Sequence, residues 1–281
     1  MKRAALIILL LVCITNCKTI EPISRVSPKP LANSEVHSNS GFIFEESQID
    51  LSFVSEAFRD FVPEVQDVDR LLDYNGFILE FDTASRNAKW VSYMLCRANL
   101  GSGEERSSNF RMDRRLGDYS PRDAAYKNSG YDRGHLAPAA DMAYSAESMY
   151  DSFYLTNASP QVPGFNRGIW KRLEEQIRRF ASEKDSIFVV TGPVLSEQMN
   201  SMSTSNIGVP ELFFKVVMDK RGNQGIGFLM RNETASGKLS EFAVTIDSVE
   251  MITRINFFPL LDTKQEAQAE SKFDLKYWFG D

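Results

Sequence analysis

The chain has 281 residues, of which 43% are hydrophobic and 25% charged, a balance that excludes a mostly disordered chain and fits one large globular domain or at most two. No apolar run reaches the roughly 20 residues that span a bilayer, which excludes a polytopic membrane protein. The formal charge of −6 argues at first against a nucleic-acid partner, because phosphate binding normally depends on Lys and Arg.

The N-terminus carries the pattern of an export signal. Lys2 and Arg3 precede the apolar run 4–14, which matches a signal-peptide core and is too short to cross a bilayer. We therefore expect residues 1–16 to be a signal peptide. Residues 14–17, Ile-Thr-Asn-Cys, resemble a bacterial lipobox, in which the cysteine becomes the lipid-modified first residue. The sequence thus predicts export, either as an outer-membrane or periplasmic lipoprotein anchored at Cys17 or as a secreted protein.

After this processing Cys96 is the one cysteine without a modification, since Cys13 leaves with the signal. A lone thiol forms no internal disulfide, so the core must stabilise the domain. Cys96 ends the apolar run 90–96, which favours a small buried core residue. A Cys96–His135 nucleophile pair is the alternative.

Two regions follow the signal. Residues 17–48 are rich in Pro, Ser and Asn with little apolar periodicity, which predicts a flexible stalk that includes His37. Residues 49–281 form the predicted folded domain. Its expected strands are the β-rich runs 77–81, 90–95, 187–190, 213–217, 226–229 and 242–246.

The strongest predicted helix covers residues 168–180. Ile169, Leu173, Ile177 and Phe180 form an apolar stripe at helical spacing. A weaker helix is expected over 248–253. Because strands outnumber helices and no regular βαβ alternation occurs, the sequence predicts an α+β domain with a mainly antiparallel sheet.

Residues with reactive side chains are most closely grouped in the stretch 131–138, Tyr-Asp-Arg-Gly-His-Leu-Ala-Pro. His135 can take a proton from water near neutral pH if its other nitrogen is oriented. Arg133 can hold an anionic phosphate with two hydrogen bonds, and Gly134 lets a ligand approach the backbone closely.

A second polar group follows on the predicted helix. Asn166, Trp170, Glu174 and Arg178 are spaced by four residues, so they lie along one side of the helix beside the apolar stripe. Asn166 can offer a neutral oxygen to a hard cation, Glu174 can hold water, and Arg178 can face a phosphate. A strand with a base, a loop and a helix with a metal ligand together make a workable phosphodiesterase site.

These motifs closely resemble those of the DNA/RNA non-specific endonucleases, the ββα-metal family that includes secreted bacterial nucleases and mitochondrial endonuclease G. The resemblance covers roughly residues 70–260. It rests on residues 132–138, on Asn-x-x-Pro-Gln at 157–161 and on Asn-x-x-x-Trp-x-x-Leu-Glu at 166–174, with supporting matches at 86–93 and 190–193.

The resemblance implies a role for each matching residue. His135 would be the general base, and Asn166 would be the direct protein ligand of Mg²⁺, with Mn²⁺ as the other candidate. Glu174 would orient the water around the metal. Phosphate binding and transition-state stabilisation would fall to Arg86, Arg133 and Arg178. Asn157 would support the site by hydrogen bonding, and Asp132 would brace the strand. The implied fold has a central antiparallel sheet flanked by helices and a ββα-metal motif.

The distribution of charge removes the objection raised by net acidity. Residues 86–97, 106–135 and 165–180 each carry a net charge of +3 and contain the motifs, whereas the rest of the chain is strongly acidic. The sequence therefore predicts an exported, metal-dependent endonuclease that cuts DNA and/or RNA without sequence specificity. Two alternatives remain: a surface lipoprotein that only binds nucleic acid or a host component, and the Cys96–His135 hydrolase. A homodimer is left open.

Overall fold

The computed structural model describes residues 61–101 and 103–280. The predicted signal peptide and stalk, with Cys17 and His37, lie outside the described residues. Within the described part, no helix combines the length and apolar character needed to cross a membrane.

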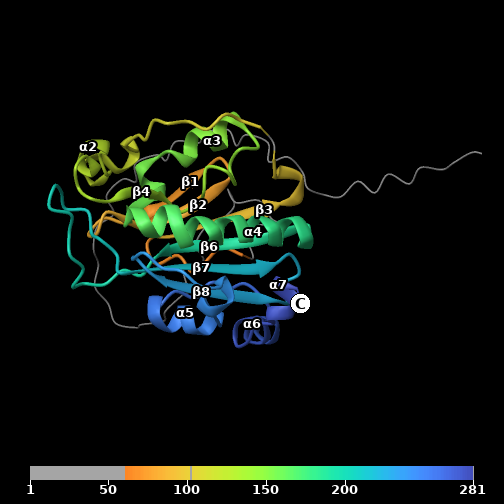
Figure 1. Ribbon diagram of the computed structural model, residues 1–281. Helices are drawn as coiled ribbons and strands as arrows, with labels where there is room; N and C mark the ends of the chain where they lie inside the picture. Colours follow the sequence, from red (N-terminus) through yellow and green to blue (C-terminus); the bar gives the residue numbers. More distant parts are fainter. Residues whose placement is uncertain (1–60, 102, 281) are drawn as a thin grey trace, which may run out of the picture.

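An antiparallel sheet forms the centre of the protein (Figure 1). Its strand order is β1-β2-β3-β6-β7-β8-β9, and every neighbouring pair is antiparallel. The strands are β1 (Leu71–Tyr74), β2 (Phe77–Asp82), β3 (Asn87–Cys96), β6 (Ser186–Pro193), β7 (Leu212–Asp219), β8 (Gly225–Arg231) and β9 (Ala243–Val244). The predicted α+β class with a mainly antiparallel sheet is thereby confirmed.

Most predicted strands coincide with observed ones. The runs 77–81, 90–95, 187–190, 213–217 and 226–229 lie within β2, β3, β6, β7 and β8. The prediction for 242–246 was wrong for most of its length, because only Ala243–Val244 is extended. Thr245 caps helix α5 (Ile246–Thr253) instead, and its Oγ1 accepts a hydrogen bond of 3.1 Å from the Ser248 amide.

Helices cover both faces of the sheet. On one face lies α4 (Lys171–Lys184), whose Leu173, Ile177 and Phe180 pack with the strands in the larger of the two sheet cores. The other face is covered by α5 and α6 (Thr263–Glu270), which share a second core with residues from β6 and β7. In Figure 1, α4 crosses in front of the sheet, and α5 and α6 lie beside β8. The remaining α-helices within the described residues are α2 (Asp123–Tyr126), α3 (Ala146–Ser152) and α7 (Leu275–Phe279).

Strand alternation assigns side chains to these two faces. In β6, Val189 faces the α4 core and Val190 faces the α5 core. In β7, Phe213 and Val217 face the α4 core. Lys215 lies between them on that same face, because side chains two residues apart share a face of the sheet. A lysine is thus placed under helix α4.

A separate two-stranded ribbon lies outside the sheet. It pairs β4 (Asp132–His135) with β5 (Ala158–Gln161) in antiparallel register. Two contacts connect it to the sheet. Ser159 Oγ donates a 2.6 Å hydrogen bond to Asn87 Oδ1 at the start of β3, and Asn232 Nδ2, just after β8, donates one of 3.0 Å to the Pro160 carbonyl.

Candidate active site

The ribbon sets the position of His135. In its register Gly134 faces Ser159 and His135 faces Ala158. A Cβ at Gly134 would collide with the side chain of Gln161, so the ribbon accepts glycine there and little else. The backbone then turns away after His135, and the Leu136 amide donates a 2.9 Å hydrogen bond to the Asn157 carbonyl.

Asn157 holds this turn with its side chain. Its Oδ1 accepts a hydrogen bond from the Ala137 amide, and its Nδ2 donates to the carbonyls of Ala137 and Ser152, each at 2.9 Å. The side chain is fully buried. Its hydrogen bonds go to the backbone, so Asn157 fixes the path of the chain beside His135.

The imidazole of His135 packs against two phenyl rings. The ring centroids of Phe110 and Phe153 are 4.9 and 4.8 Å from that of His135. His135 is 8% exposed, and its Nε2 is buried without a hydrogen-bond partner among the described residues. Burial, with a smaller contribution from the Arg106 guanidinium, lowers the pKa of His135 to about 3. The imidazole is therefore neutral at pH 7 and able to accept a proton.

Asn166 lies beside the first residue of the same ribbon. It belongs to a wide helical turn, Phe165–Trp170, which precedes α4 and departs from helical backbone at Gly168. Asn166 Nδ2 donates a 2.9 Å hydrogen bond to Asp132 Oδ2, and Asp132 also forms an ion pair with Arg167. The hydrogen bonds and charge of these neighbours lower the pKa of Asp132 despite its partial burial, so it stays ionised as an acceptor.

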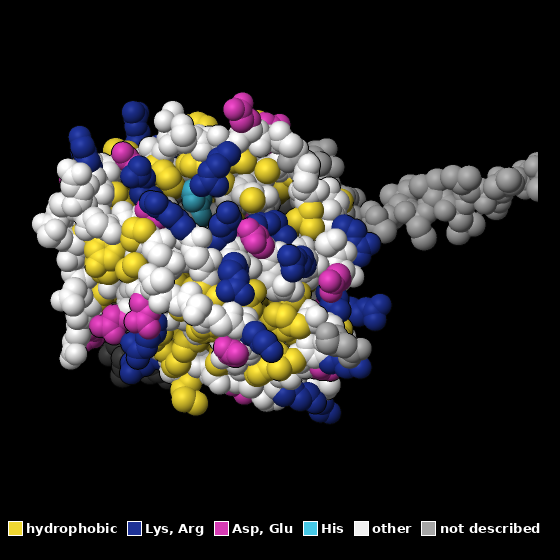
Figure 2. Space-filling model, in the orientation of Figure 1, with side chains coloured by type: hydrophobic (Ala, Val, Ile, Leu, Met, Phe, Trp, Pro, Cys, Tyr) yellow, Lys and Arg dark blue, Asp and Glu magenta, His cyan; other side chains and the backbone are white. Residues whose placement is uncertain are grey.

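An open hollow of about 370 Å³ brings part of the predicted site together. Its walls include Asn166 and Arg133, and the others are Phe110, Tyr131, Asp132 and Arg167. Arg133 pairs with Asp123 at 3.2 Å and lies over the Phe110 ring. Figure 2 shows the described histidine, in cyan, set among Lys and Arg side chains. The surface around the hollow is thus suited to a polyanion.

Glu174 and Arg178 belong to a charged cluster under α4. Arg178 Nη1 donates a 2.8 Å hydrogen bond to Asp141 Oδ1, and the Tyr93 hydroxyl donates one of 2.9 Å to Asp141 Oδ2. Asp141 is 1% exposed and Arg178 is partly exposed. Asp141 therefore holds the Arg178 guanidinium in a fixed position.

Lys215 lies opposite Glu174 in this cluster and is fully buried. Its ammonium donates a 3.0 Å hydrogen bond to Thr191 Oγ1, and it lies 4.7 Å from the centroid of the Trp170 ring. Burial raises the pKa of Glu174 and lowers that of Lys215, while the attraction between the two opposes both shifts. The pKa of Glu174 still rises to about 7 and that of Lys215 falls to about 8, so each group favours the charged form of the other without fully offsetting burial.

Arg86 occupies the turn between β2 and β3 in left-handed backbone, with φ 57°. Within the described residues its guanidinium makes no hydrogen bond or ion pair, although the next residue, Asn87, contacts the ribbon through Ser159. The structure thus places Arg86 near the ribbon without joining it to the other predicted residues.

Cys96 has a different environment from His135. It is 1% exposed at the end of β3, where its register partner is Ser186. The rings against His135 are those of Phe110 and Phe153. This arrangement favours the expected core role for Cys96 over a nucleophile pair.

Comparison with known proteins decides the family. The family model for DNA/RNA non-specific endonucleases matches residues 54–264. The chain belongs to the DNA/RNA non-specific endonuclease family.

Individual relatives agree with this assignment. A nuclease of Syncephalastrum racemosum is 33% identical over 231 residues, which cover 73% of this chain and 72% of the relative. Human mitochondrial endonuclease G is 31% identical over 207 residues, 68% of this chain and 70% of that protein. The solved structure of EndoG in complex with EndoGI matches with a TM-score of 0.67 and 26% identity, covering 74% of this chain and 92% of that one. The chain is therefore a nucleic-acid hydrolase by family.

The residues of this endonuclease fit a divalent cation at Asn166. The amide nitrogen is occupied by Asp132, which orients the carbonyl oxygen as a neutral ligand for a hard cation. The hollow beside it is open to solvent and leaves room for water and phosphate oxygens. Mg²⁺ prefers such sites, with few protein ligands and several waters.

Sequence reasoning missed three residues of the endonuclease site, Asp141, Lys215 and Arg106. A signal existed for two of them, because Asp141 and Lys215 are single charges inside otherwise apolar stretches. Buried charges of that kind are rare unless paired, so each pointed to a partner. Arg106 had no such signal. It lies in irregular chain, exposed, over the Phe153 ring and within electrostatic reach of His135 and Glu174.

Proposed function

We propose that this protein is an exported, metal-dependent endonuclease that hydrolyses phosphodiester bonds of DNA and RNA without sequence specificity. The observation that carries the proposal is the arrangement along the ribbon. A neutral imidazole lies at one end, at His135, and a carboxylate-oriented amide lies beside the other end, where Asn166 meets Asp132. The cation would be Mg²⁺, with Mn²⁺ as the alternative.

His135 acts as the general base in this proposal. Its buried setting keeps the ring neutral, and the flanking Phe110 and Phe153 rings limit its rotation. A neutral imidazole can remove a proton from the attacking water, a contribution of about 10²–10⁴ in rate. The proton then resides on the imidazole, where the nearby Arg106 charge favours its release after the reaction.

The cation, when bound by Asn166, supplies Lewis-acid activation of the phosphate and stabilises the leaving oxygen. Arg133 and Arg178 hold the phosphate from two sides of the site. Arg178 is fixed by Asp141, and Arg133 is positioned by Asp123 and Phe110. The Lys215 ammonium favours the ionised form of Glu174, which can then accept a hydrogen bond from water. Arg86 serves as an outer phosphate contact.

Lack of sequence specificity follows from the kind of residue at the site. Arg133 and Arg167 line the hollow and Arg106 lies over the Phe153 ring, which contacts His135; guanidinium groups bind phosphate whatever the base. Backbone contacts of this type serve DNA and RNA alike. Binding should weaken as salt rises, because it releases counterions from the nucleic acid.

Export is supported by the N-terminal sequence. Lys2, Arg3 and the apolar run 4–14 form the signal, and Cys17 is the proposed lipid anchor to the cell envelope. Residues 17–48 would then separate the anchor from the catalytic domain. Labelling with a fatty-acid analogue tests the anchor, since a Cys17→Ser variant should lose the label.

A cleavage assay tests the proposed function. The purified protein is incubated with plasmid, single-stranded DNA and RNA at matched concentrations, with Mg²⁺ and with EDTA. We expect cleavage of all three substrates that stops on chelation. Activity that persists in EDTA would refute the single-metal mechanism. Binding without cleavage of any substrate would favour the surface-lipoprotein alternative.

A further inference from the structure

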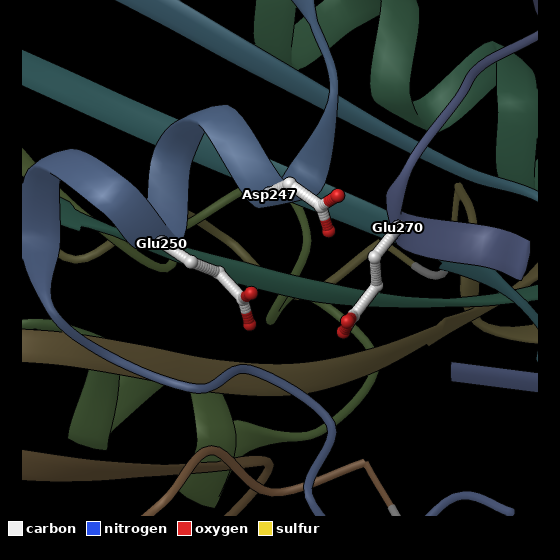
Figure 3. A group of neighbouring side chains, drawn as sticks. All are labelled: Asp247, Glu250 and Glu270. Atoms are coloured by element: carbon white, nitrogen blue, oxygen red, sulfur yellow. The ribbon is translucent and has the colours of Figure 1, made fainter. Parts of the chain in front are cut away.

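Three carboxylates converge on the face of the sheet opposite the active site. Asp247 and Glu250 project from α5, and Glu270 projects from the end of α6. One oxygen from each lies within 4.8 Å of the others. Figure 3 shows the three side chains turned toward a common space between the two helices.

Glu270 is the buried member of the group. It is 4% exposed, and its Oε1 is buried without a hydrogen-bond partner among the described residues. A buried carboxylate without a partner is strongly unfavourable, so such a group either holds a proton or meets a cation. Its carboxylate points toward Glu250 and Asp247 (Figure 3).

Among the described residues, no basic group compensates the charge of the Glu270 carboxylate. The charged side chains that act on it in the described part of the chain are Glu250, Glu266 and Asp247, all acidic. Burial, followed by these three charges, raises the pKa of Glu270 to about 8. The same kind of environment raises the pKa of Glu250. Carboxyl groups are thus gathered between α5 and α6 without a basic partner among the described residues.

One oxygen of Glu250 is already held in place. Its Oε1 accepts a 2.8 Å hydrogen bond from the Phe257 amide, which fixes the carboxylate and leaves Oε2 for another partner. Metal-binding carboxylates are commonly oriented in this way by a second hydrogen bond. Asp247 is exposed at the first turn of α5, so it connects the buried oxygens to solvent.

We propose that Asp247, Glu250 and Glu270 bind a calcium ion that joins α5 to α6, at a structural site separate from the active site. Ca²⁺ accepts carboxylate oxygens in irregular geometry at 2.3–2.6 Å, so oxygens within 4.8 Å of one another can share it. Water fills the remaining positions through the exposed side at Asp247. Mg²⁺ fits less well, because it demands near-ideal octahedral geometry and is usually held by one or two carboxylates.

Binding and stability measurements on the full chain test this site. The Asn166→Ala background removes the proposed active-site ligand, so that any remaining calcium effect comes from elsewhere. In this background we expect calorimetry to show one bound Ca²⁺. Millimolar CaCl₂ should raise the melting temperature by about 5 °C, and equal MgCl₂ should raise it much less.

Two variants show whether the three carboxylates are responsible. In EDTA, Glu270→Gln should melt at or above the temperature of its parent, because it removes an unpaired buried carboxylate. Calcium should then cause no increase in the melting temperature of this variant. Asp247→Asn, on the exposed side, should weaken calcium binding at least tenfold without harming the fold. Glu183→Gln, an exposed helical glutamate on α4, is the matched control and should respond to calcium like its parent.

The proposal fails if calcium leaves the Asn166→Ala protein unaffected, since Glu270 would then hold a proton instead. It also fails if Glu270→Gln and Asp247→Asn respond to calcium as fully as Glu183→Gln does. Neither result depends on nuclease activity. The calcium site and the proposed function can therefore fail separately.

Discussion

The side-chain amide of Asn166 donates a 2.9 Å hydrogen bond to the carboxylate of Asp132, across 34 residues of sequence. This contact joins the start of the catalytic ribbon to the turn before α4. The side-chain nitrogen of Asn166 is thereby committed to Asp132, which leaves its carbonyl oxygen as the atom available to a cation. Asp132 lines the same hollow, so its negative charge also lies beside the proposed cation site.

Replacing Asp132 should weaken metal binding more than catalysis. In Asp132→Asn the amide of Asn166 loses its ionised acceptor, so the carbonyl is no longer held toward the hollow. We expect the Mg²⁺ concentration for half-maximal cleavage to rise about 10–100-fold. The rate at saturating Mg²⁺ should fall much less.

Arg167→Gln is the control for this variant. It removes the ion pair with Asp132 but leaves the Asn166 hydrogen bond in place. Its Mg²⁺ dependence should match that of the parent. An equal increase in the Mg²⁺ concentration for half-maximal cleavage in both variants would show that the ion pair, and not the orientation of Asn166, determines metal affinity.

His135→Ala should abolish nearly all cleavage. Loss of a general base reduces the rate by about 10²–10⁴. The circular dichroism spectrum should remain that of the parent, because the ribbon is held by Asn157, Asn87 and Asn232 rather than by the imidazole. Normal cleavage rates in a folded variant would refute the mechanism.

The buried imidazole should also make stability depend on pH. The pKa of His135 is lowered from 6.5 to about 3 on folding, so between these values the unfolded chain binds a proton that the folded chain does not. The stability that depends on the neutral imidazole of His135 is fully present above pH 6.5 and is lost as the pH falls. From pH 7.5 to 5, the parent should lose up to about 2 kcal/mol more free energy of unfolding than His135→Ala.

Chemical denaturation of both proteins in EDTA measures this difference, and the other titrating groups cancel in the comparison. Parallel losses in the two proteins would mean that His135 titrates alike in the folded and unfolded chains. The same lowered pKa keeps the base neutral in mild acid. We therefore expect no fall in kcat/KM near pH 6.5 from this group.

Lys215 and Glu174 should show a large coupling energy. Lys215→Met removes the buried ammonium whose charge favours ionised Glu174, and we expect it to cost about 1–3 kcal/mol of stability. Adding Glu174→Gln removes the uncompensated charge. The double variant should then be more stable than the sum of the single effects predicts, by about 1–3 kcal/mol.

Equilibrium denaturation of the parent, the two single variants and the double variant measures this coupling energy. Lys171→Met, an exposed lysine on α4, is the control and should change stability by less than about 0.5 kcal/mol. Additive effects at Lys215 and Glu174 would show that the two charges do not support each other.

The elements with strong periodicity were predictable from the sequence. Strands β6 and β7 are continuous apolar runs, and α4 carries the stripe of Leu173, Ile177 and Phe180, because each must bury side chains in the shared core. The error at 242–246 had a local cause. The hydroxyl of Thr245 stabilises a helix start more strongly than the short apolar run favours a strand.

Candidate site residues could be predicted from the sequence where they belong to a single motif. His135 and Asn166 belong to motifs, whereas Asp141 and Lys215 reach the site through the packing of α4 on the sheet. That packing places Lys215 under Trp170 although the two are far apart in sequence. Pairings of this kind depend on tertiary register, which periodicity does not encode. The roles assigned to the individual site residues remain predictions until the variants are measured.

The anchoring of the ribbon has a consequence for biosynthesis. The contacts from Ser159 to Asn87 and from Pro160 to Asn232 each span 72 residues. Asn87 precedes the ribbon in the sequence, and Asn232 follows it. A growing chain can close the first contact early, but the second needs β7 and β8 to be complete. His135 and Asn166 are synthesised long before that point. The nascent protein thus contains its catalytic residues well before it can hold them in position, and nuclease activity should appear only when the domain is nearly finished.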